Sequence, residues 1–276
     1  MSGTLYIVAT PIGNLEDISF RALRILREVD IIAAEDTRVS RKLLNHFEIK
    51  KPLISYYEHN KTLREQALME LLLEGKDLAL ISDAGTPAIS DPGQDLVQAA
   101  AARNIPVVVL PGASAMLTAL VGSALDTGRF CFEGFLPRDK KERRERLQEL
   151  RAEKRTMIFY EAPHRLKTIL ADMQEAWGAE RRISAGRELT KLHEEMLRGT
   201  IGELCQLYAQ QEPRGEYVLV VAGAEEEAPE EIDPELIAGE LDSLLESGMP
   251  RKEAARILAD RYGMKVRDIY QMGLKN

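Results

Sequence analysis

The chain has 276 residues, 45% of them hydrophobic and 30% charged, with a formal net charge of −8. This length suffices for two domains and a small third piece, and the composition is that of a folded globular protein. The charge excludes a uniformly basic nucleic-acid binder, although basic faces remain possible because partners contact patches. The two cysteines, Cys131 and Cys205, are too few and too distant for a disulfide framework or a cysteine-ligated zinc site.

The N-terminal residues run directly into an apolar segment without a basic region. No segment approaches the ~18 uninterrupted apolar residues of a membrane helix. We therefore expect no signal peptide and no membrane span, and we expect a cytoplasmic protein.

Residues 1–125 alternate short apolar runs with amphipathic segments. Unbroken apolar runs predict strands buried on both faces of a parallel sheet, at Leu5–Ala9, Ile31–Ala33, Leu78–Ile81 and Val107–Leu110. Apolar residues at helical spacing predict helices at Ser19–Val29, Lys61–Glu74, Asp95–Arg103 and Ser114–Ala124. The alternation predicts an α/β domain with a parallel core.

A second α/β unit is expected over residues 126–224. Its predicted strands are Phe130–Glu133, Thr156–Tyr160, Arg182–Ala185, Glu195–Arg198 and Tyr217–Ala222. Its predicted helices are Lys140–Glu153, Leu166–Trp177 and Ile201–Gln211. The short spacing of the last three strands favours a mixed or antiparallel sheet.

The composition changes at residue 225. Glu225 to Glu235 contains seven carboxylates in eleven residues, which indicates a solvated linker. Residues 236–276 predict a small domain of three short helices, Leu236–Glu246, Pro250–Tyr262 and Val266–Leu274.

A loop rich in Gly, Pro or Asp follows each apolar run of the first unit. These loops are Thr10–Asn14, Ala34–Arg38, Ser82–Pro87 and Pro111–Ala115. Because the carboxyl ends of parallel strands meet along one edge, the loops predict a ligand site there. The chain lacks a G-x-G-x-x-G fingerprint and a G-x-x-x-x-G-K-S/T loop, which argues against dinucleotide or nucleoside-triphosphate binding.

Four carboxylates fall on the same predicted edge, Glu35, Asp36, Asp83 and Asp91. They could bind Mg²⁺, act as bases or attract a cation. No histidine accompanies them, so we expect no metal and favour a cationic ligand such as a sulfonium. Ser114 stands at a predicted helix start, where its hydroxyl could cap the helix or leave the free N–H groups to a ligand.

Two segments are locally basic within this acidic chain. Arg138 to Arg155 contains nine Lys or Arg against five Asp or Glu, and Arg251 to Asn276 contains seven against three. Two interpretations explain the first segment equally well. It could be a solvated helix with i,i+4 charge pairs, or it could be a face that binds phosphate groups.

Six motifs together resemble the ribosomal RNA small-subunit methyltransferase I family of the tetrapyrrole-methylase superfamily. They are Ala9–Asp17, Ala34–Arg38, Ser82–Pro87, Pro111–Ala115, Tyr160–Arg165 and Arg214–Glu216. The resemblance implies two α/β domains of the tetrapyrrole-methylase type, with S-adenosylmethionine in the cleft between them, plus the small C-terminal helical domain. It also implies a homodimer that methylates the ribose 2′-oxygen of a cytidine in the decoding centre of 16S rRNA, in the small ribosomal subunit.

The resemblance carries cofactor contacts onto matching positions of this chain. These are Pro11, Gly13, Asp83, Thr86, Ile89, Ser114, Ala115, Ala162 and Gly215. Thr86 stands where the superfamily usually has an aspartate. A ribose hydroxyl is a poor nucleophile, so a base should assist, and the candidate catalytic residues are Glu161, His164, Glu188 and Lys191.

We expect RNA backbone contacts from basic residues of the two segments and of the second loop. These are Arg38, Arg143, Arg144, Arg146, Arg251 and Lys252. Two alternatives remain open at this stage: a related methylase acting on a small tetrapyrrole-like substrate, and a non-catalytic RNA-binding ribosome factor that retains the fold.

Overall fold

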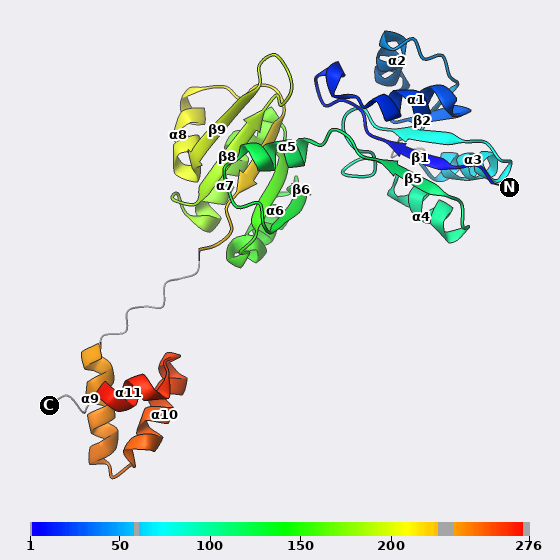
Figure 1. The fold of residues 1–276 in the computed structure, drawn as a ribbon. Coiled ribbons are helices and arrows are strands. Elements are labelled where there is room, and N and C mark those ends of the chain that lie inside the picture. Colours follow the sequence, from blue (N-terminus) through cyan, green and yellow to red (C-terminus); the bar gives the residue numbers. More distant parts are fainter. Residues whose placement is uncertain (1, 58–60, 226–233, 273–276) are drawn as a thin grey trace. The chain divides into compact units, whose positions relative to one another are not determined.

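The computed structural model describes residues 2–57, 61–225 and 234–272. The chain divides into two compact units, Met1–Ala224 and Glu225–Asn276 (Figure 1). The larger unit contains two five-stranded sheets, and the smaller unit contains helices.

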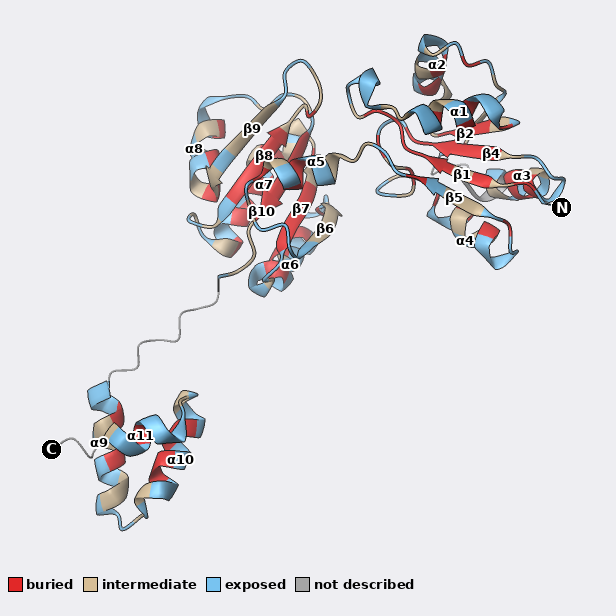
Figure 2. Ribbon diagram, viewed as in Figure 1, coloured by how far each residue is buried: buried red, intermediate tan, exposed pale blue. Residues whose placement is uncertain are grey.

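The first sheet is entirely parallel, as predicted. Its strands are β1 (Leu5–Val8), β2 (Ile31–Ala34), β3 (Leu53–Ser55), β4 (Leu78–Ile81) and β5 (Val107–Leu110), in the order β3-β2-β4-β1-β5. Helices α1 (Phe20–Glu28) and α2 (Thr37–His46) cover one face, and α3 (Lys61–Leu73) and α4 (Gln94–Ala102) cover the other. All four residues of β4 are buried (Figure 2), which explains their unbroken apolar sequence.

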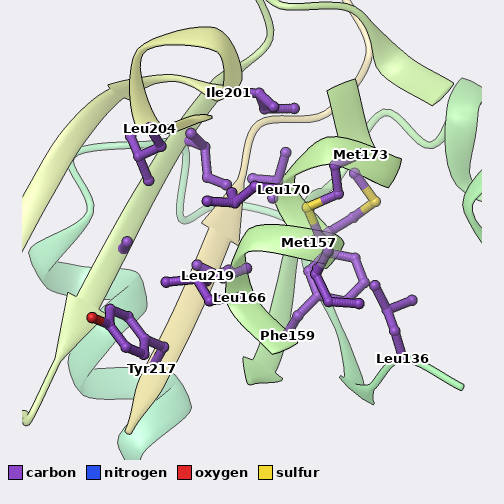
Figure 3. Packing of buried hydrophobic residues seen from close by; sticks show 14 of the residues in the cluster. Leu136, Met157, Phe159, Leu166, Leu170, Met173, Ile201, Leu204, Tyr217 and Leu219 are labelled. Atoms are coloured by element: carbon purple, nitrogen blue, oxygen red, sulfur yellow. The ribbon is translucent and has the colours of Figure 1, made fainter. Parts of the chain in front are cut away.

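The second sheet is mixed. It contains β6 (Phe130–Phe135), β7 (Thr156–Glu161), β8 (Arg182–Arg187), β9 (Glu195–Thr200) and β10 (Tyr217–Val221), in the order β6-β7-β10-β8-β9. Only the β6–β7 pair among these neighbours is parallel. Helices α6 (Lys140–Glu149), α7 (Pro163–Trp177) and α8 (Ile201–Gln210) contribute to the core on one face, where Met157 and Phe159 meet Leu166 and Leu170 (Figure 3).

Helix α5 (Ala115–Gly122) follows the last strand of the first sheet but packs against the second sheet. Its buried residues Ala119 and Leu120 join Ile158, Val218 and Val220, which point away from the face that α7 covers. Strand alternation places these three side chains on that opposite face. The helix that we expected within residues 1–125 therefore completes the core of the second half.

Two elements of the first half are absent from the sequence-based prediction. Helix α2 begins at Thr37 with Asp36 as its N-cap, so Thr37 and Arg38 are helical and the predicted loop is shorter. Strand β3 has three half-buried residues at the edge of the sheet. Both were overlooked because α2 carries few apolar residues and β3 is too short for its periodicity to be recognised.

Strand β6 extends two residues beyond its predicted end because it contains a bulge. The register with β7 shifts between Phe132 and Gly134, and Gly134 has a φ of +66°. The extra residue, Glu133, places Phe132 and Phe135 on the same face of the strand, opposite Ile158 and Tyr160.

The smaller unit has a hydrophobic core of its own. It comprises α9 (Pro234–Glu246), α10 (Arg251–Tyr262) and α11 (Val266–Met272) around Leu241, Leu258 and Ile269. Gly263, with a φ of +64°, ends α10 and allows the short turn into α11. Most of the predicted acidic linker, residues 226–233, and the predicted helix end at 273–274 lie outside the described residues, whereas Pro234 and Glu235 belong to α9.

None of the helices described is both long and apolar enough to cross a membrane.

Candidate active site

Three loops at the carboxyl edge of the first sheet are joined by hydrogen bonds. Thr10, after β1, exchanges two backbone hydrogen bonds with Gly85, after β4, at 2.9 and 3.0 Å. The Thr10 hydroxyl also donates to the Ser82 carbonyl at 3.1 Å. Thr86 then donates from Oγ1 to the carbonyl of Ala113, after β5, at 3.3 Å. The loops identified from their composition therefore form one continuous edge, as their positions after parallel strands predicted.

A cavity of about 760 Å³ opens along this edge, which is within the range of cofactor sites. The first half contributes the loop after β4 and the loop after β5, including Thr86, Ile89 and Gly112. The second half contributes the start of α5, the end of β7 and the start of β10. The exposed lining is mainly apolar, and a few polar groups converge on it.

Two helices begin at the cavity without side-chain caps. Ser114 is the N-cap of α5 and Ala162 that of α7, and neither makes a capping hydrogen bond through its side chain. The Ser114 hydroxyl therefore does not serve its helix, which removes the simpler of the two sequence-based interpretations. Both helix starts present main-chain N–H groups that favour a negatively charged ligand group.

Glycine is required where the loop after β5 passes β1. A Cβ atom on Gly112 would lie 2.6 Å from the Cβ of Ala9, so a side chain would push the strand end and the loop apart. The backbone at Gly112 can therefore form part of the cavity wall only without a side chain.

Three carboxylates line the cavity, Asp91, Glu161 and Glu216. Desolvation by burial raises the pKa of Asp91 to about 6, and the neighbouring Glu35 carboxylate adds to this increase. Burial also raises the pKa of Glu161, against the hydrogen bond from the Ala162 N–H at 2.8 Å and the nearby Arg165 guanidinium at 3.5 Å. Negative groups of this kind favour a cation inside the cavity.

Lys191 lines the cavity but is held by two acids. Its Nζ lies 2.9 Å from Glu188 Oε1 and 2.8 Å from Glu216 Oε2. Burial opposes its charge, but these hydrogen bonds prevail and raise the pKa of Lys191. The Lys191 hydrogen bond is likewise the main reason that the pKa of Glu188 is lowered. Both groups are therefore charged, and neither is suited to take a proton at neutral pH.

Five of the nine expected cofactor residues lie in the cavity wall, namely Thr86, Ile89, Ser114, Ala115 and Ala162. The other four are Pro11, Gly13, Asp83 and Gly215, which do not belong to the wall as the described residues form it. Gly13 lies against a wall residue, since an added Cβ would be 2.4 Å from Lys191 Cγ. Gly215 similarly accommodates Glu188, whose Cγ would be 2.5 Å from such an atom.

Asp83 supports the neighbouring loop instead of facing the cavity. Its Oδ1 accepts a hydrogen bond from the Asp36 N–H at 3.0 Å, which fixes the entrance to α2. Burial is the main cause that raises the pKa of Asp83 and likewise that of Glu35.

Of the four candidate catalytic residues, Glu161 and Lys191 reach the cavity. Glu188 stands behind Lys191, and His164 is exposed on α7. The structure thus brings Glu161, Lys191 and Glu188 to one region and leaves His164 outside the described wall.

The basic residues predicted to contact RNA have different environments. Arg38 is exposed and pairs with Asp36 at 2.6 Å. On α6, Arg144 pairs with Glu175, and Arg146 pairs with Glu133 and Glu149 at 2.6 and 2.7 Å. In the smaller unit, Lys252 is exposed, and the Arg251 guanidinium lies 5.8 Å from the Tyr270 ring centre.

Arg143 requires a correction. It is only 5% exposed, and its Nη2 lies 2.7 Å from Asp172 Oδ2 on α7. Its remaining guanidinium hydrogen bonds go to the carbonyls of Pro137 and Arg138. Arg143 therefore forms a buried structural ion pair with Asp172, and its burial leaves almost no surface for contact with RNA.

Several wall residues were not among the sequence-based site residues. They include Met116, Phe135 and Tyr217. Asp91, by contrast, was expected at this edge as one of four carboxylates, and it does line the cavity. Phe135 could not be predicted, since its direction depends on the bulge in β6.

The fold and the cavity define a class of methyltransferase. The family model of tetrapyrrole (corrin/porphyrin) methylases matches residues 4–205. Diphthine synthase superposes with a TM-score of 0.62 at 13% identity, over 80% of this chain and 90% of that one. A uroporphyrin-III C-methyltransferase from Thermus thermophilus, solved with S-adenosylhomocysteine, gives 0.57 at 16% identity, over 80% and 97%.

Closer relatives are found by sequence. The ribosomal RNA small subunit methyltransferase I of Synechocystis sp. is 48% identical, over 99% of this chain and 98% of that protein. The protein of the same name from Halalkalibacterium halodurans is 50% identical, over 98% and 94%. The chain therefore belongs to the tetrapyrrole methylase family and, within it, to the ribosomal RNA small subunit methyltransferase I family, and it is a methyltransferase.

Replacing Asp91 with asparagine should stabilise the fold at neutral pH. The pKa of Asp91 is about 6 in the folded protein against 3.8 for the free group, so the ionised form is disfavoured by folding. That cost is absent below pH 3.8, grows up to about pH 6 and is constant above it. Allowing for solvent screening of a half-buried group, we expect Asp91→Asn to gain about 1 kcal/mol at pH 8.

Urea denaturation of both proteins between pH 4 and pH 8 measures this difference. Asp17→Asn, at an exposed position, is the control for loss of one negative charge. Equal stability of the wild type and Asp91→Asn at every pH would show that Asp91 is not desolvated.

Proposed function

We propose that this protein transfers a methyl group from S-adenosylmethionine to the 2′-hydroxyl of a cytidine in the decoding centre of 16S rRNA, in the cytoplasm. The observation that carries this proposal is the near-full-length identity of 48–50% to proteins named ribosomal RNA small subunit methyltransferase I. The family resemblance of the loop motifs supports the finer assignment to a cytidine 2′-oxygen.

The chemistry of the cavity fits S-adenosylmethionine. This cofactor combines a flat nucleoside, a positively charged sulfur, and an amino acid group with one negative and one positive end. The apolar lining suits the nucleoside, and the uncapped starts of α5 and α7 suit the carboxylate. We propose Thr86, Ile89, Ser114, Ala115 and Ala162 as direct contacts, with Pro11, Gly13, Asp83 and Gly215 shaping the loops around them.

When bound, the cofactor would supply a methyl group from its sulfonium, and the sulfur would keep the electron pair of the broken S–CH₃ bond and become a neutral thioether. The chain's own task is to hold the nucleophile and to accept its proton. We propose Glu161 as the general base, because among the four candidates it alone lines the cavity with a raised pKa and an acceptor oxygen. Lys191, fixed by Glu188 and Glu216, would position this part of the cavity wall.

The RNA backbone would contact basic groups that remain accessible. We propose Arg38, Lys252 and the half-buried Arg251, with weaker contributions from Arg144 and Arg146, whose charges are already paired. In this division of labour, residues 1–125 and 126–224 form the cofactor and substrate cleft and residues 236–276 form an RNA-contact domain.

We also propose that the protein is a homodimer. On α5, Val121 and Leu117, which also lines the cavity, are 76% and 45% exposed, although Ala119 and Leu120 of the same helix are buried. Exposed neighbouring apolar groups of this kind mark interaction surfaces. The homodimer implied by the family resemblance gives this surface a second copy of the chain as its partner.

Methylation of unmodified small ribosomal subunits tests the function and the base together. We expect wild-type enzyme to yield 2′-O-methylcytidine on nucleoside analysis. Glu161→Gln keeps the side-chain volume but removes the base, so kcat should fall roughly 10²- to 10⁴-fold with little change in cofactor Kd. Glu28→Gln, at an exposed position of α1, is the control. Label in a base, or in a small tetrapyrrole instead of RNA, would refute the proposed reaction, and full turnover by Glu161→Gln would exclude that base.

Lys252→Ala should weaken RNA binding without changing cofactor binding. One lost phosphate contact lowers the slope of log K against log salt by about 1. Filter binding of small subunits at several salt concentrations measures the slope. Lys76→Ala, an exposed lysine in the first half of the chain, is the control. Identical salt slopes for the two variants would show that Lys252 does not contact the RNA.

Val121→Glu should dissociate the dimer, because a charge at an apolar interface is left without a partner. Analytical ultracentrifugation of the full chain should show a dimer for the wild type and a monomer for the variant. A monomeric wild type would refute the homodimer, and a dimeric Val121→Glu protein would place its interface elsewhere.

A further inference from the structure

One end of the cavity has an aromatic wall that depends on the β6 bulge. Phe132 and Phe135 lie on the same face of β6, and their ring centres are 4.9 and 5.7 Å from that of Tyr160. Both contacts are edge-to-face. Tyr160 and Phe135 line the cavity, and Phe135 is 54% exposed, so an aromatic face is available to a ligand.

The loop after β4 brings a carboxylate to the same end. Asp91 is close enough to Tyr160 for its charge to raise the pKa of the phenol, although burial is the larger cause. Ser90, beside it, approaches Gly134 of the bulge: a Cβ on that glycine would lie 3.8 Å from Ser90 Oγ. Asp91, the β6 bulge and the aromatic wall therefore lie next to one another at this end of the cavity.

The ionised Asp91 carboxylate is energetically unfavourable in this part of the cavity wall. Within the described parts of the chain, no lysine or arginine forms an ion pair with it. Burial works against its ionised form, and the Glu35 carboxylate adds repulsion. The Ser82 side chain provides one hydrogen bond to Asp91, which partly opposes these effects. A carboxylate has two acceptor oxygens, so a ligand could provide a further donor.

The backbone around Asp91 is strained. Ala88 and Ser90 have φ values of +67° and +62°, a region that residues other than glycine rarely adopt. The loop is then held by Gly93, where a Cβ would lie 2.6 Å from Leu80 Cδ2. Strain retained beside a cavity is typical of loops that position a functional group.

We propose that Phe135, Tyr160 and Asp91 form the subsite that receives the target base, with Asp91 selecting cytosine; this rests on the proposed function. The base leaves its stack and lies against the Phe135 ring, and its exocyclic amino group donates a hydrogen bond to the Asp91 carboxylate. Enzymes that modify nucleotides commonly read an extruded base by stacking and by hydrogen bonds to its edge.

This arrangement discriminates cytosine from uracil. Cytosine presents an N4 amino donor, whereas uracil presents an O4 acceptor at the same position. Two acceptors facing each other, O4 and a carboxylate oxygen, repel and leave both without a donor. Asp91 therefore acts on substrate choice, while Glu161 is the proposed base in the methyl transfer.

The test compares small subunits that carry cytidine or uridine at the methylated position. For wild-type enzyme we expect a kcat/KM about 100-fold higher on cytidine. Asp91→Asn, whose amide can donate to O4, should reduce the cytidine-to-uridine ratio by roughly 10-fold or more. Its cofactor Kd, measured by calorimetry, should stay within about twofold of wild type, and the stability gain expected above shows independently that it folds.

Phe135→Leu should lower kcat/KM on both substrates roughly 10-fold by removing a stacking face, whereas Phe135→Tyr retains the ring and should retain the rate. Equal losses on cytidine and uridine with Asp91→Asn would overturn the selection role and indicate a part in the chemistry. A cofactor Kd weakened as much as kcat/KM would make Asp91 a cofactor contact instead. If wild-type enzyme forms no 2′-O-methylcytidine, the proposed function itself fails, and this inference fails with it.

Discussion

The burial of α5 on the second sheet is the contact on which the active site depends. The chain leaves the first sheet after β5 through Pro111 and Gly112 and then forms α5. Ala119 and Leu120 of this helix pack among residues of β7 and β10. Arg198 reinforces this contact by donating from Nε to the Gly122 carbonyl, at the end of the helix, at 2.9 Å. Because the start of the same helix lines the cavity, its packing positions the main-chain N–H groups of that start between the first sheet's edge and the second half.

The sequence was sufficient for the architecture because buried strands leave a strong signal. Unbroken apolar runs such as Leu78–Ile81 are found where a sheet is covered on both faces, and a parallel sheet must gather its loops on one edge. The attachment of α5 to the second sheet could not be predicted, since helical periodicity identifies an apolar face without identifying its partner. Helix α2 has few apolar residues and strand β3 has only three residues, so neither was predicted.

The site was predictable by loop but not by side chain. Motif resemblance located the loops that hold Thr86, Ser114 and Ala162, and these residues do line the cavity. It could not show that Asp83 turns to the Asp36 N–H whereas Asp91 faces inward. Nor could charge counting reveal that Arg143 is buried against Asp172, because a basic helix and a helix with one inward arginine have the same composition. Side-chain direction depends on bulges, positive φ angles and tertiary partners, which periodicity does not record.

Each half of the larger unit is built from one nearly continuous stretch of sequence, and this affects how the protein folds. The two cores around the first sheet use residues only up to Leu110, and the two around the second sheet draw almost entirely on Ala115 to Val221. Each half can therefore collapse as a continuous stretch, the N-terminal one first as it leaves the ribosome. The cavity is completed only when the halves dock. A ligand that binds there would therefore stabilise the docked state alone and make the last step of assembly depend on the ligand concentration.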